Sequence, residues 1–191
     1  MEEKVRYLSR IYQHPDLGIE DIQKLAAVHE KVSFKKGDFI LQKGEILNEY
    51  YILEKGLFRS FVHDYQGNDI TIDFFSENDI LIEVSSLFQR IPTQENIEAL
   101  TDSVAYKIDF TDFQELFHKL GGFSEWGRSW MSSSLFSFKN RSTLMRVESA
   151  RERYERLLKE KPTVGKMAPL KHIASYLGIT DSTLSRIRKV R

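Results

Sequence analysis

The sequence contains no cysteine among its 191 residues. Without thiols the chain cannot form disulfides, thiolate zinc sites, cysteine-ligated iron–sulfur clusters or cysteine nucleophiles. It also lacks long apolar runs, because charged residues interrupt each hydrophobic stretch before the ~20 residues needed to span a bilayer. The start, Met1-Glu2-Glu3-Lys4, does not read as a secretory signal. We therefore expect a cytoplasmic protein without a membrane partner.

The short motifs that mark common enzymes are also missing. There is no glycine-rich phosphate loop, no His-Glu-x-x-His, no Gly-x-Ser-x-Gly and no cluster of metal ligands. Paired acids such as Glu77 and Asp79 lie in a segment that reads as a turn, where charge is the ordinary solvated state. Five scattered histidines are expected to be surface or packing residues rather than haem ligands: His14, His29, His63, His118 and His172. We expect no catalysis, no metal and no bound cofactor.

Positive and negative charges are unevenly distributed, although the formal net charge is zero. Residues 1–138 hold 14 Lys and Arg against 23 Asp and Glu, whereas residues 139–191 hold 14 against 5. A basic end on an acidic body indicates a polyanion partner for that end alone. A solvated, charged helical tail explains the charge pattern equally well.

Short segments separated by glycines dominate residues 34–110. They are rich in Ile, Phe, Tyr and Val, and they are divided by Gly37, Gly44, Gly56 and Gly67. Apolar residues alternate with polar ones in two of them, namely Ile70, Ile72 and Phe74, and Val104, Tyr106, Ile108 and Phe110. This pattern predicts an antiparallel roll or barrel, with Gln66-Gly67-Asn68 as a hairpin tip.

On both sides of this region, apolar residues recur at the intervals of an α-helix. Residues 5–28 predict two short helices, and residues 113–120 an apolar helical stripe ended by Gly121-Gly122. A helix over 123–145 then carries a broad apolar face, formed by Trp126, Trp130, Met131, Leu135 and Phe138. We expect this face to pack both on the roll and on a second copy of the helix. Residues 148–160 predict an amphipathic helix that ends before Pro162.

Residues 170–187 have the pattern of a helix-turn-helix. Ile173 and Leu177 suit the inner face of a first helix, with Pro169 in its first turn and small Ala174 where a second helix crosses it. Gly178 suits a left-handed turn. The second helix is predicted by Ile179 in the turn, Thr180 as N-cap, and Leu184 and Ile187 on the inner face.

The outward face of the second helix is polar, as a helix that enters the major groove requires. Arg186 is the leading candidate to read a base, because a guanidinium can bond guanine O6 and N7 together. Lys171, Thr183 and Lys189 are candidates for phosphate contacts. The remaining candidate DNA-binding residues are Thr180, Asp181, Ser182 and Ser185. An αα-hairpin without a nucleic-acid role is the structural alternative.

Three segments together resemble the cyclic-nucleotide-binding roll of the Crp/Fnr regulators: residues 34–44, 51–56 and 78–81. A long helix and a helix-turn-helix follow in that family's order. The resemblance implies an α+β fold with an antiparallel, jelly-roll-like β-roll. It also implies a homodimer joined through the long helix and bound to double-stranded DNA, with half-sites ~34 Å apart. RNA polymerase is a further candidate partner.

The sequence departs from the family where a cyclic nucleotide would bind. Ile82-Glu83 stands in place of the family's Gly-Glu, and our alignment places Thr93-Gln94 opposite its phosphate-binding Arg-Ser. Burying a phosphate without a cation costs several kcal/mol, so we do not expect cyclic AMP unless Arg90 turns inward. Another small effector, or none, remains open. Candidate pocket residues are Glu83, Ser85, Ser86, Thr93, Gln94, Ser133 and Ser137. The serines of 132–137 are explained equally well by a close helix contact.

We divide the chain into a sensor roll with N-terminal helices (1–122), a dimerisation helix (123–147) and a helix-turn-helix domain (148–191). No strand-forming segment follows residue 187, so we expect little or no wing. The function predicted is a sequence-specific DNA-binding transcription regulator. The alternative is a ligand-binding regulatory module that acts through protein contacts without DNA.

Overall fold

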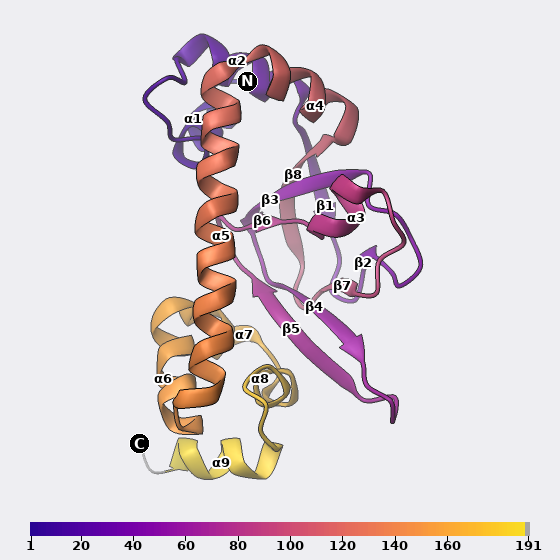
Figure 1. Cartoon of the computed structure of the whole chain (residues 1–191), viewed down its shortest axis with the longest axis vertical. Helices are drawn as coiled ribbons and strands as arrows, with labels where there is room; N and C mark the ends of the chain where they lie inside the picture. Colours follow the sequence, from indigo (N-terminus) through magenta and orange to yellow (C-terminus); the bar gives the residue numbers. More distant parts are fainter. Residues whose placement is uncertain (190–191) are drawn as a thin grey trace.

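The computed structural model describes residues 1–189 as an α+β fold in which a β-roll lies beside one long helix (Figure 1). The strands are β1 (Glu30–Phe34), β2 (Phe39–Leu41), β3 (Glu49–Lys55), β4 (Phe58–His63), β5 (Asp69–Phe75), β6 (Ile80–Leu81), β7 (Asn96–Ala99) and β8 (Ser103–Asp109). The helices are α1 (Glu2–Ile11), α2 (Ile19–Val28), α3 (Val84–Gln89), α4 (Phe110–Lys119), α5 (Gly121–Val147), α6 (Ala150–Glu160), α7 (Pro162–Met167), α8 (Leu170–Tyr176) and α9 (Asp181–Lys189). The predicted fold class is confirmed.

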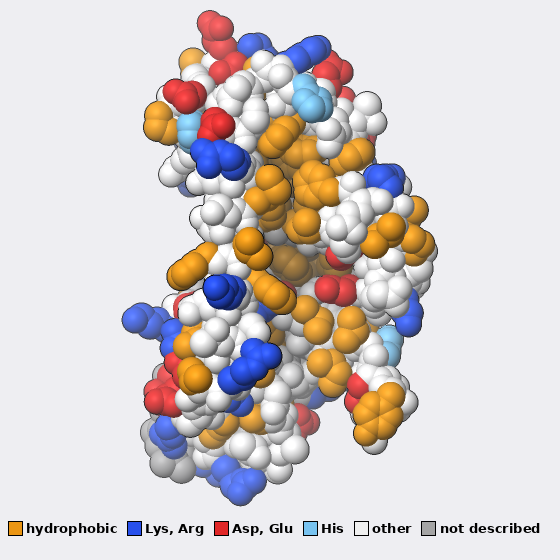
Figure 2. All heavy atoms as spheres, in the orientation of Figure 1, with side chains coloured by type: hydrophobic (Ala, Val, Ile, Leu, Met, Phe, Trp, Pro, Cys, Tyr) orange, Lys and Arg blue, Asp and Glu red, His pale blue; other side chains and the backbone are white. Residues whose placement is uncertain are grey.

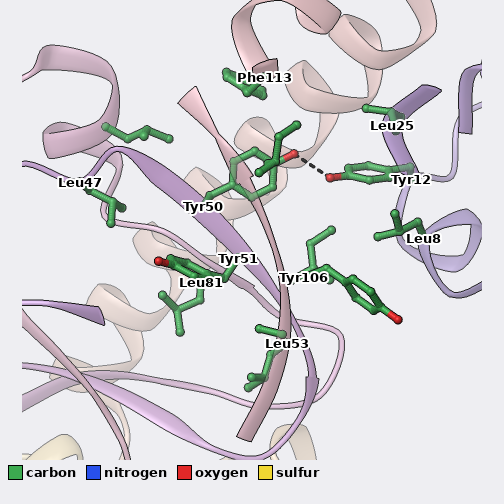
Figure 3. Close-up of a cluster of buried hydrophobic side chains, with 14 of the residues drawn as sticks. Leu8, Tyr12, Leu25, Leu47, Tyr50, Tyr51, Leu53, Leu81, Tyr106 and Phe113 are labelled. Carbon is green, nitrogen blue, oxygen red and sulfur yellow. Dashed lines mark hydrogen bonds between the residues drawn. The ribbon is translucent and has the colours of Figure 1, made fainter. Parts of the chain in front are cut away.

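Two four-stranded antiparallel sheets build the roll, in the orders β1-β8-β3-β6 and β2-β7-β4-β5. The larger hydrophobic core joins their inner faces to α1, α2, α4 and the first turns of α5. Aromatic rings dominate the end of this core beneath the helices, where Tyr12 at the end of α1, Tyr50 of β3 and Phe113 of α4 meet (Figure 3). Within residues 1–189, no helix is both long and apolar enough to cross a membrane.

The β4–β5 hairpin confirms one sequence prediction and corrects another. Its tip is Gln66-Gly67-Asn68 as expected, with Gly67 at φ +84°. The alternation predicted for Ile70, Ile72 and Phe74 is wrong, because Thr71 and Phe74 are the buried pair. The register of β5 against β4 shifts and leaves Ile72 out of the ladder. Because the bulge adds one residue to the strand, Thr71 and Phe74, which are three positions apart, point to the same face.

A second hydrophobic core joins the roll directly to the C-terminal helices. Its buried members are Leu57, Phe74 and Leu100 from the roll, and Tyr154, Leu157, Val164, Ile173, Ala174, Leu177 and Leu184 from α6 to α9. The rings of Phe74 on β5 and Tyr176 on α8 have centroids 5.2 Å apart. The helix-turn-helix therefore shares its core with β5.

Several helix ends differ from the sequence predictions. Gly121 and Gly122 begin α5 as well as following α4, and a Cβ on Gly122 would lie 2.3 Å from the carbonyl oxygen of Asp16. The helix predicted over 148–160 begins at Ala150, because Ser149 and Glu152 form a capping box. Pro169 is the N-cap of α8 rather than part of its first turn. Helix α7 lies between α6 and α8 and was not predicted from the sequence. Residues 148–189 contain no strand.

His29 is a buried, neutral histidine that links α2 to the roll. Its Nδ1 lies 2.7 Å from the carbonyl oxygen of Leu25 and its Nε2 lies 2.8 Å from the hydroxyl of Tyr12. Because a carbonyl only accepts, Nδ1 carries the proton and Nε2 accepts from Tyr12, whose oxygen bonds Tyr50 at 2.7 Å (Figure 3). Burial lowers the pKa of His29 to about 4.

Lowering the pH from 6 to 5 is expected to reduce the free energy of unfolding by about 1 kcal/mol through His29. The ring titrates near its ordinary pKa of 6.5 when unfolded and near a pKa of about 4 when folded. The unfolded state therefore binds more protons in this window, and stability falls as the pH falls. Urea unfolding at several pH values measures the slope. The pKa of His172 is also lowered to about 4, so the slope should decrease, but not vanish, in His29→Gln. An unchanged slope in that variant would exclude His29 as the group.

Candidate functional site

The helix-turn-helix predicted from the sequence is present as α8, a tight turn and α9. Gly178 adopts φ +64°, where a Cβ would also lie 3.1 Å from Cε of Met145 on α5. The amide of Ile179 donates to the carbonyl of Ala174 at 3.0 Å, which closes the end of α8. Glycine adopts the left-handed backbone conformation at a lower free-energy cost than any other residue. The turn is therefore determined by the local sequence.

Thr180 caps α9, as predicted. Its Oγ1 accepts from the amide of Thr183 at 3.2 Å, which satisfies one of the free N–H groups at the helix start. Asp181, in the first turn, places negative charge near the positive end of the helix dipole. The last turn is basic, with Arg186, Arg188 and Lys189.

The polar face of α9 points away from the protein. Leu184 is fully buried against α8, and Ile187 is half-buried on the same side. Of the candidate DNA-binding residues, Thr183 is half-buried, and the exposed ones are Lys171, Thr180, Asp181, Ser182, Ser185, Arg186 and Lys189. Arg188 is exposed beside them and was not singled out from the sequence. Lys and Arg side chains gather over the C-terminal helices at the lower end of the molecule (Figure 2).

The long helix α5 is buried at its start and exposed in its middle. Phe123 and Trp126 pack in the larger core, where the indole Nε1 of Trp126 donates to the carbonyl of Ile11 at 3.0 Å. Every residue from 131 to 140 is exposed, and Leu135 and Phe138 leave 69% and 61% of their surface free. The expected packing of this helix on the roll is confirmed for its first turns.

An apolar hollow opens between α4, the start of α5 and β6. No charged side chain lines it; the lining residues are Tyr50, Ile80, Ile82, Phe88, Phe113, Phe117, Trp126, Gly127, Trp130 and Met131. Figure 2 shows hydrophobic side chains gathered in the depression between the long helix and the roll. This hollow offers nothing that would pair with a phosphate.

The predicted pocket residues around α3 bond to the protein itself. Glu83 caps α3, and its carboxylate accepts from the amides of Ser85 and Ser86 at 3.2 and 2.6 Å. The hydroxyl of Ser86 is buried and accepts from the amide of Leu47 at 2.8 Å. No hydrogen bond in the described part of the chain joins Ser133 or Ser137 of α5 to this group, and both serines are exposed. The structure thus groups Glu83, Ser85 and Ser86, and leaves the α5 serines apart.

Acidic residues lie near the place of the family's phosphate-binding Arg-Ser, and the nearby Arg141 is paired with Asp73. Thr93 is buried, and its Oγ1 accepts from the amide of Glu95 at 3.0 Å, whereas Gln94 is exposed. Burial raises the pKa of Glu95, and the charges of Glu83 and Asp73 raise it further, against the lowering effects of a hydrogen bond from Ser60 and the charge of Arg141. The sequence reading missed Glu95, which no local motif marks. These residues do not fit a cyclic phosphate.

Arg90 does not replace the missing cation. It ends α3 with φ +58°, and its guanidinium donates to the carbonyl of Leu47 at 2.8 Å and to the side chain of Asn48. The guanidinium also lies 5.0 Å from the ring centre of Phe110. Turning toward the pocket would break all three contacts.

The comparisons with known proteins agree with this architecture. The family profile of the cyclic nucleotide-binding domain matches residues 31–119. FixK2 from Bradyrhizobium japonicum is 19% identical, over 85% of this chain and 83% of that one, with a TM-score of 0.72. A Crp/Fnr-family transcriptional regulator from Eubacterium rectale is 17% identical, over 94% and 86%, with a TM-score of 0.70. The c-di-GMP-responsive regulator CLP from Xanthomonas campestris is 13% identical, over 90% of each chain, with a TM-score of 0.66.

No curated protein matches the sequence. At sequence identities this low, the similarity establishes a shared fold only. Ligands and partners have to be inferred from the residues themselves. Residues 31–119 match the cyclic nucleotide-binding domain family, and over most of its length the chain has the fold of the Crp/Fnr family regulators.

Proposed function

We propose that this protein is a cytoplasmic, homodimeric transcription regulator that binds specific DNA sequences through α9 and is not an enzyme. The observation that carries the proposal is the outward polar face of α9, with Ser182, Ser185 and Arg186 exposed while Leu184 is buried. A helix held in this way by its neighbour can enter a major groove with its N-terminal residues toward the base edges. The basic last turn supports the proposal, because phosphates attract it.

The homodimer is supported by the apolar stripe of α5. Met131, Leu135, Phe138 and Met145 are exposed at intervals of four, three and seven residues, the spacing of a coiled-coil seam. A contiguous stripe of exposed apolar side chains is typical of a protein–protein contact surface. Packing α5 in parallel against its counterpart would place the two α9 helices at the same end of the assembly, as a near-palindromic operator requires.

The decisive experiment is a map of genome-wide DNA occupancy, followed by binding measurements on the recovered sequences at several salt concentrations. Binding should weaken steeply with salt, because phosphate contacts release counterions. Binding that is insensitive to salt, or no binding to any fragment, would refute DNA recognition. A protein partner that co-purifies after nuclease treatment would instead favour the regulatory module without DNA.

Arg186→Ala should relax sequence selectivity, whereas Lys189→Ala should weaken binding to all sequences alike. Loss of a bidentate contact to one base is expected to reduce discrimination at that position by about 1–3 kcal/mol. Loss of a phosphate contact lowers the salt slope by about one and leaves the preferred sequence unchanged. Affinities for the operator and for single-base variants separate the two effects. If Arg186→Ala keeps full discrimination at every position, Arg186 does not read a base.

We further propose that any effector of the roll is a small molecule other than cyclic AMP. Saturating cyclic AMP should leave the melting temperature unchanged, because Thr93 and Gln94 take the place of the family's Arg-Ser and the nearby carboxylates of Glu83 and Glu95 would repel a phosphate. A thermal-shift screen of metabolites, with cyclic AMP included, measures this directly. A clear, saturable stabilisation by cyclic AMP would contradict it. CLP, which shares the fold, is described as responding to a different nucleotide, c-di-GMP.

A further inference from the structure

Arg59 of β4 is a buried cation at the contact between the roll and α8. Its side chain is almost fully enclosed, and it donates to Glu98 at 2.6 Å and to Asp69 at 2.7 Å, both within the roll. A third contact crosses to α8, where the guanidinium lies 2.6 Å from Nδ1 of His172. Because arginine only donates, Nδ1 of His172 must be unprotonated and accept. The contact thus requires a neutral imidazole in one tautomer.

The roll holds Arg59 ready for this contact. Burial alone would raise the pKa of Asp69, but the hydrogen bond and charge of Arg59 outweigh it, so the carboxylate is ionised and the pKa is lowered. Burial, and then the charge of Arg59, lowers the pKa of His172 to about 4. Two carboxylates therefore fix the donor within the roll, and α8 supplies only the acceptor.

Ser175, three residues further along α8, sets the position of the helix on β5. Its hydroxyl accepts from the amide of Thr71 at 2.9 Å and donates to the carbonyl of Asp69 at 3.1 Å. The Ser175 hydroxyl thus satisfies two backbone groups of the edge strand β5 that have no partner strand on that side. Together with Arg59, it restricts how α8 can slide or rotate on the strand.

A second ionic group lies toward the other end of β5. Asp73 pairs with Arg141 of α5 at 2.9 Å and with Lys161 at 3.4 Å, and Arg141 also donates to the hydroxyl of Tyr176 on α8 at 3.2 Å. Burial would lower the pKa of Lys161, but the charges of Asp73 and Asp79 outweigh it and raise the pKa. Both ends of α8 are therefore tied to one strand of the sensor.

We propose that Arg59 is a positioning residue for DNA binding, which sets the orientation of α8, and with it α9, relative to the roll. The inference rests on the proposed function. Because α9 follows α8 through the tight turn at Gly178 and shares a hydrophobic core with it, we expect the two helices to move together. Both half-sites of an operator can be bound together only while the two α9 helices keep a fixed orientation. Loosening the Arg59–His172 contact therefore weakens operator binding without altering a residue that touches DNA.

The absence of cysteine allows a direct measurement in the full-length protein. Spin labels on Lys55→Cys of β3 and Arg188→Cys of α9, both exposed, report the distance between roll and α9. Excess unlabelled protein restricts the measured distances to one chain. We expect a single narrow distribution in the otherwise unchanged protein and a broad or shifted one in His172→Leu. His172→Asn should restore the narrow distribution, because Oδ1 of asparagine can accept where Nδ1 did.

The same His172 variants, without labels, are then tested on an operator duplex selected by the protein. His172→Leu should bind about 10-fold more weakly, the size of one charge-assisted hydrogen bond, and His172→Asn should bind nearly as the parent does. Arg59→Gln should behave as His172→Leu does if it folds. Arg128→Gln, which removes an exposed arginine of α5, is the matched control and should change neither readout.

Two outcomes would overturn the proposal: an unchanged distance distribution in His172→Leu, or a changed distribution with operator affinity intact. If the parent protein binds no duplex at all, the proposed function fails. The distance measurement then decides by itself whether the Arg59–His172 contact orients the helix pair. Failure of the proposed function and failure of this inference are therefore separate results.

Discussion

Replacing Leu135 and Phe138 together by glutamate is expected to leave the protein monomeric and to weaken operator binding by at least about 100-fold. Both side chains are largely exposed on α5 and lie in the heptad stripe. Buried glutamates facing their own copies across a two-fold axis would repel and lose hydration. A monomer engages one half-site at a time, so the gain from simultaneous binding disappears.

Sedimentation measures the oligomeric state, and titration with one-half-site and two-half-site duplexes measures the affinities. Binding to a single half-site should change little, because α9 is untouched. Ser129→Glu with Asn140→Glu is the control, since it adds the same charge to α5 at exposed positions outside the stripe. A double variant in the stripe that remains dimeric would show that α5 is not the dimer interface.

Phe74→Ala is expected to lower the free energy of unfolding by about 3–5 kcal/mol and to loosen the helix-turn-helix, although the residue belongs to the roll. Phe74 is fully buried in the core that β5 shares with α6 to α9, and it contacts the ring of Tyr176. Truncation leaves a cavity at that boundary, and the packed helices cannot collapse into it without moving.

Urea denaturation measures the loss of stability, and hydrogen exchange of the α8 amides measures the local effect. Exchange should accelerate in α8 more than in β3, which lies in the other core. Tyr65→Ala, at the exposed hairpin tip, should change stability by less than about 0.5 kcal/mol. A loss below about 1 kcal/mol in Phe74→Ala would indicate that the shared core is not holding the helices.

The helix-turn-helix and the hairpin tip were predictable because their determinants are local. Gly178 adopts a backbone conformation that other residues resist, Thr180 caps the next turn, and Leu184 repeats the apolar spacing. Each of these preferences involves residues only a few positions apart, so it is written in a short stretch of sequence. The same holds for Gly67 at the tip of the β4–β5 hairpin.

What the sequence determined by itself, then, was the succession of roll, long helix and helix-turn-helix, the outward face of α9 and the absence of the family's phosphate-binding Arg-Ser. Only the tertiary structure decided that Arg59 and His172 meet, since 113 positions separate them. The tertiary structure also decided which residues of β5 are buried, through the bulge at Ile72. It further decided that Arg90 donates to the carbonyl of Leu47 instead of turning toward the pocket. Contacts between distant segments depend on how whole elements pack, and no short-range preference encodes that packing.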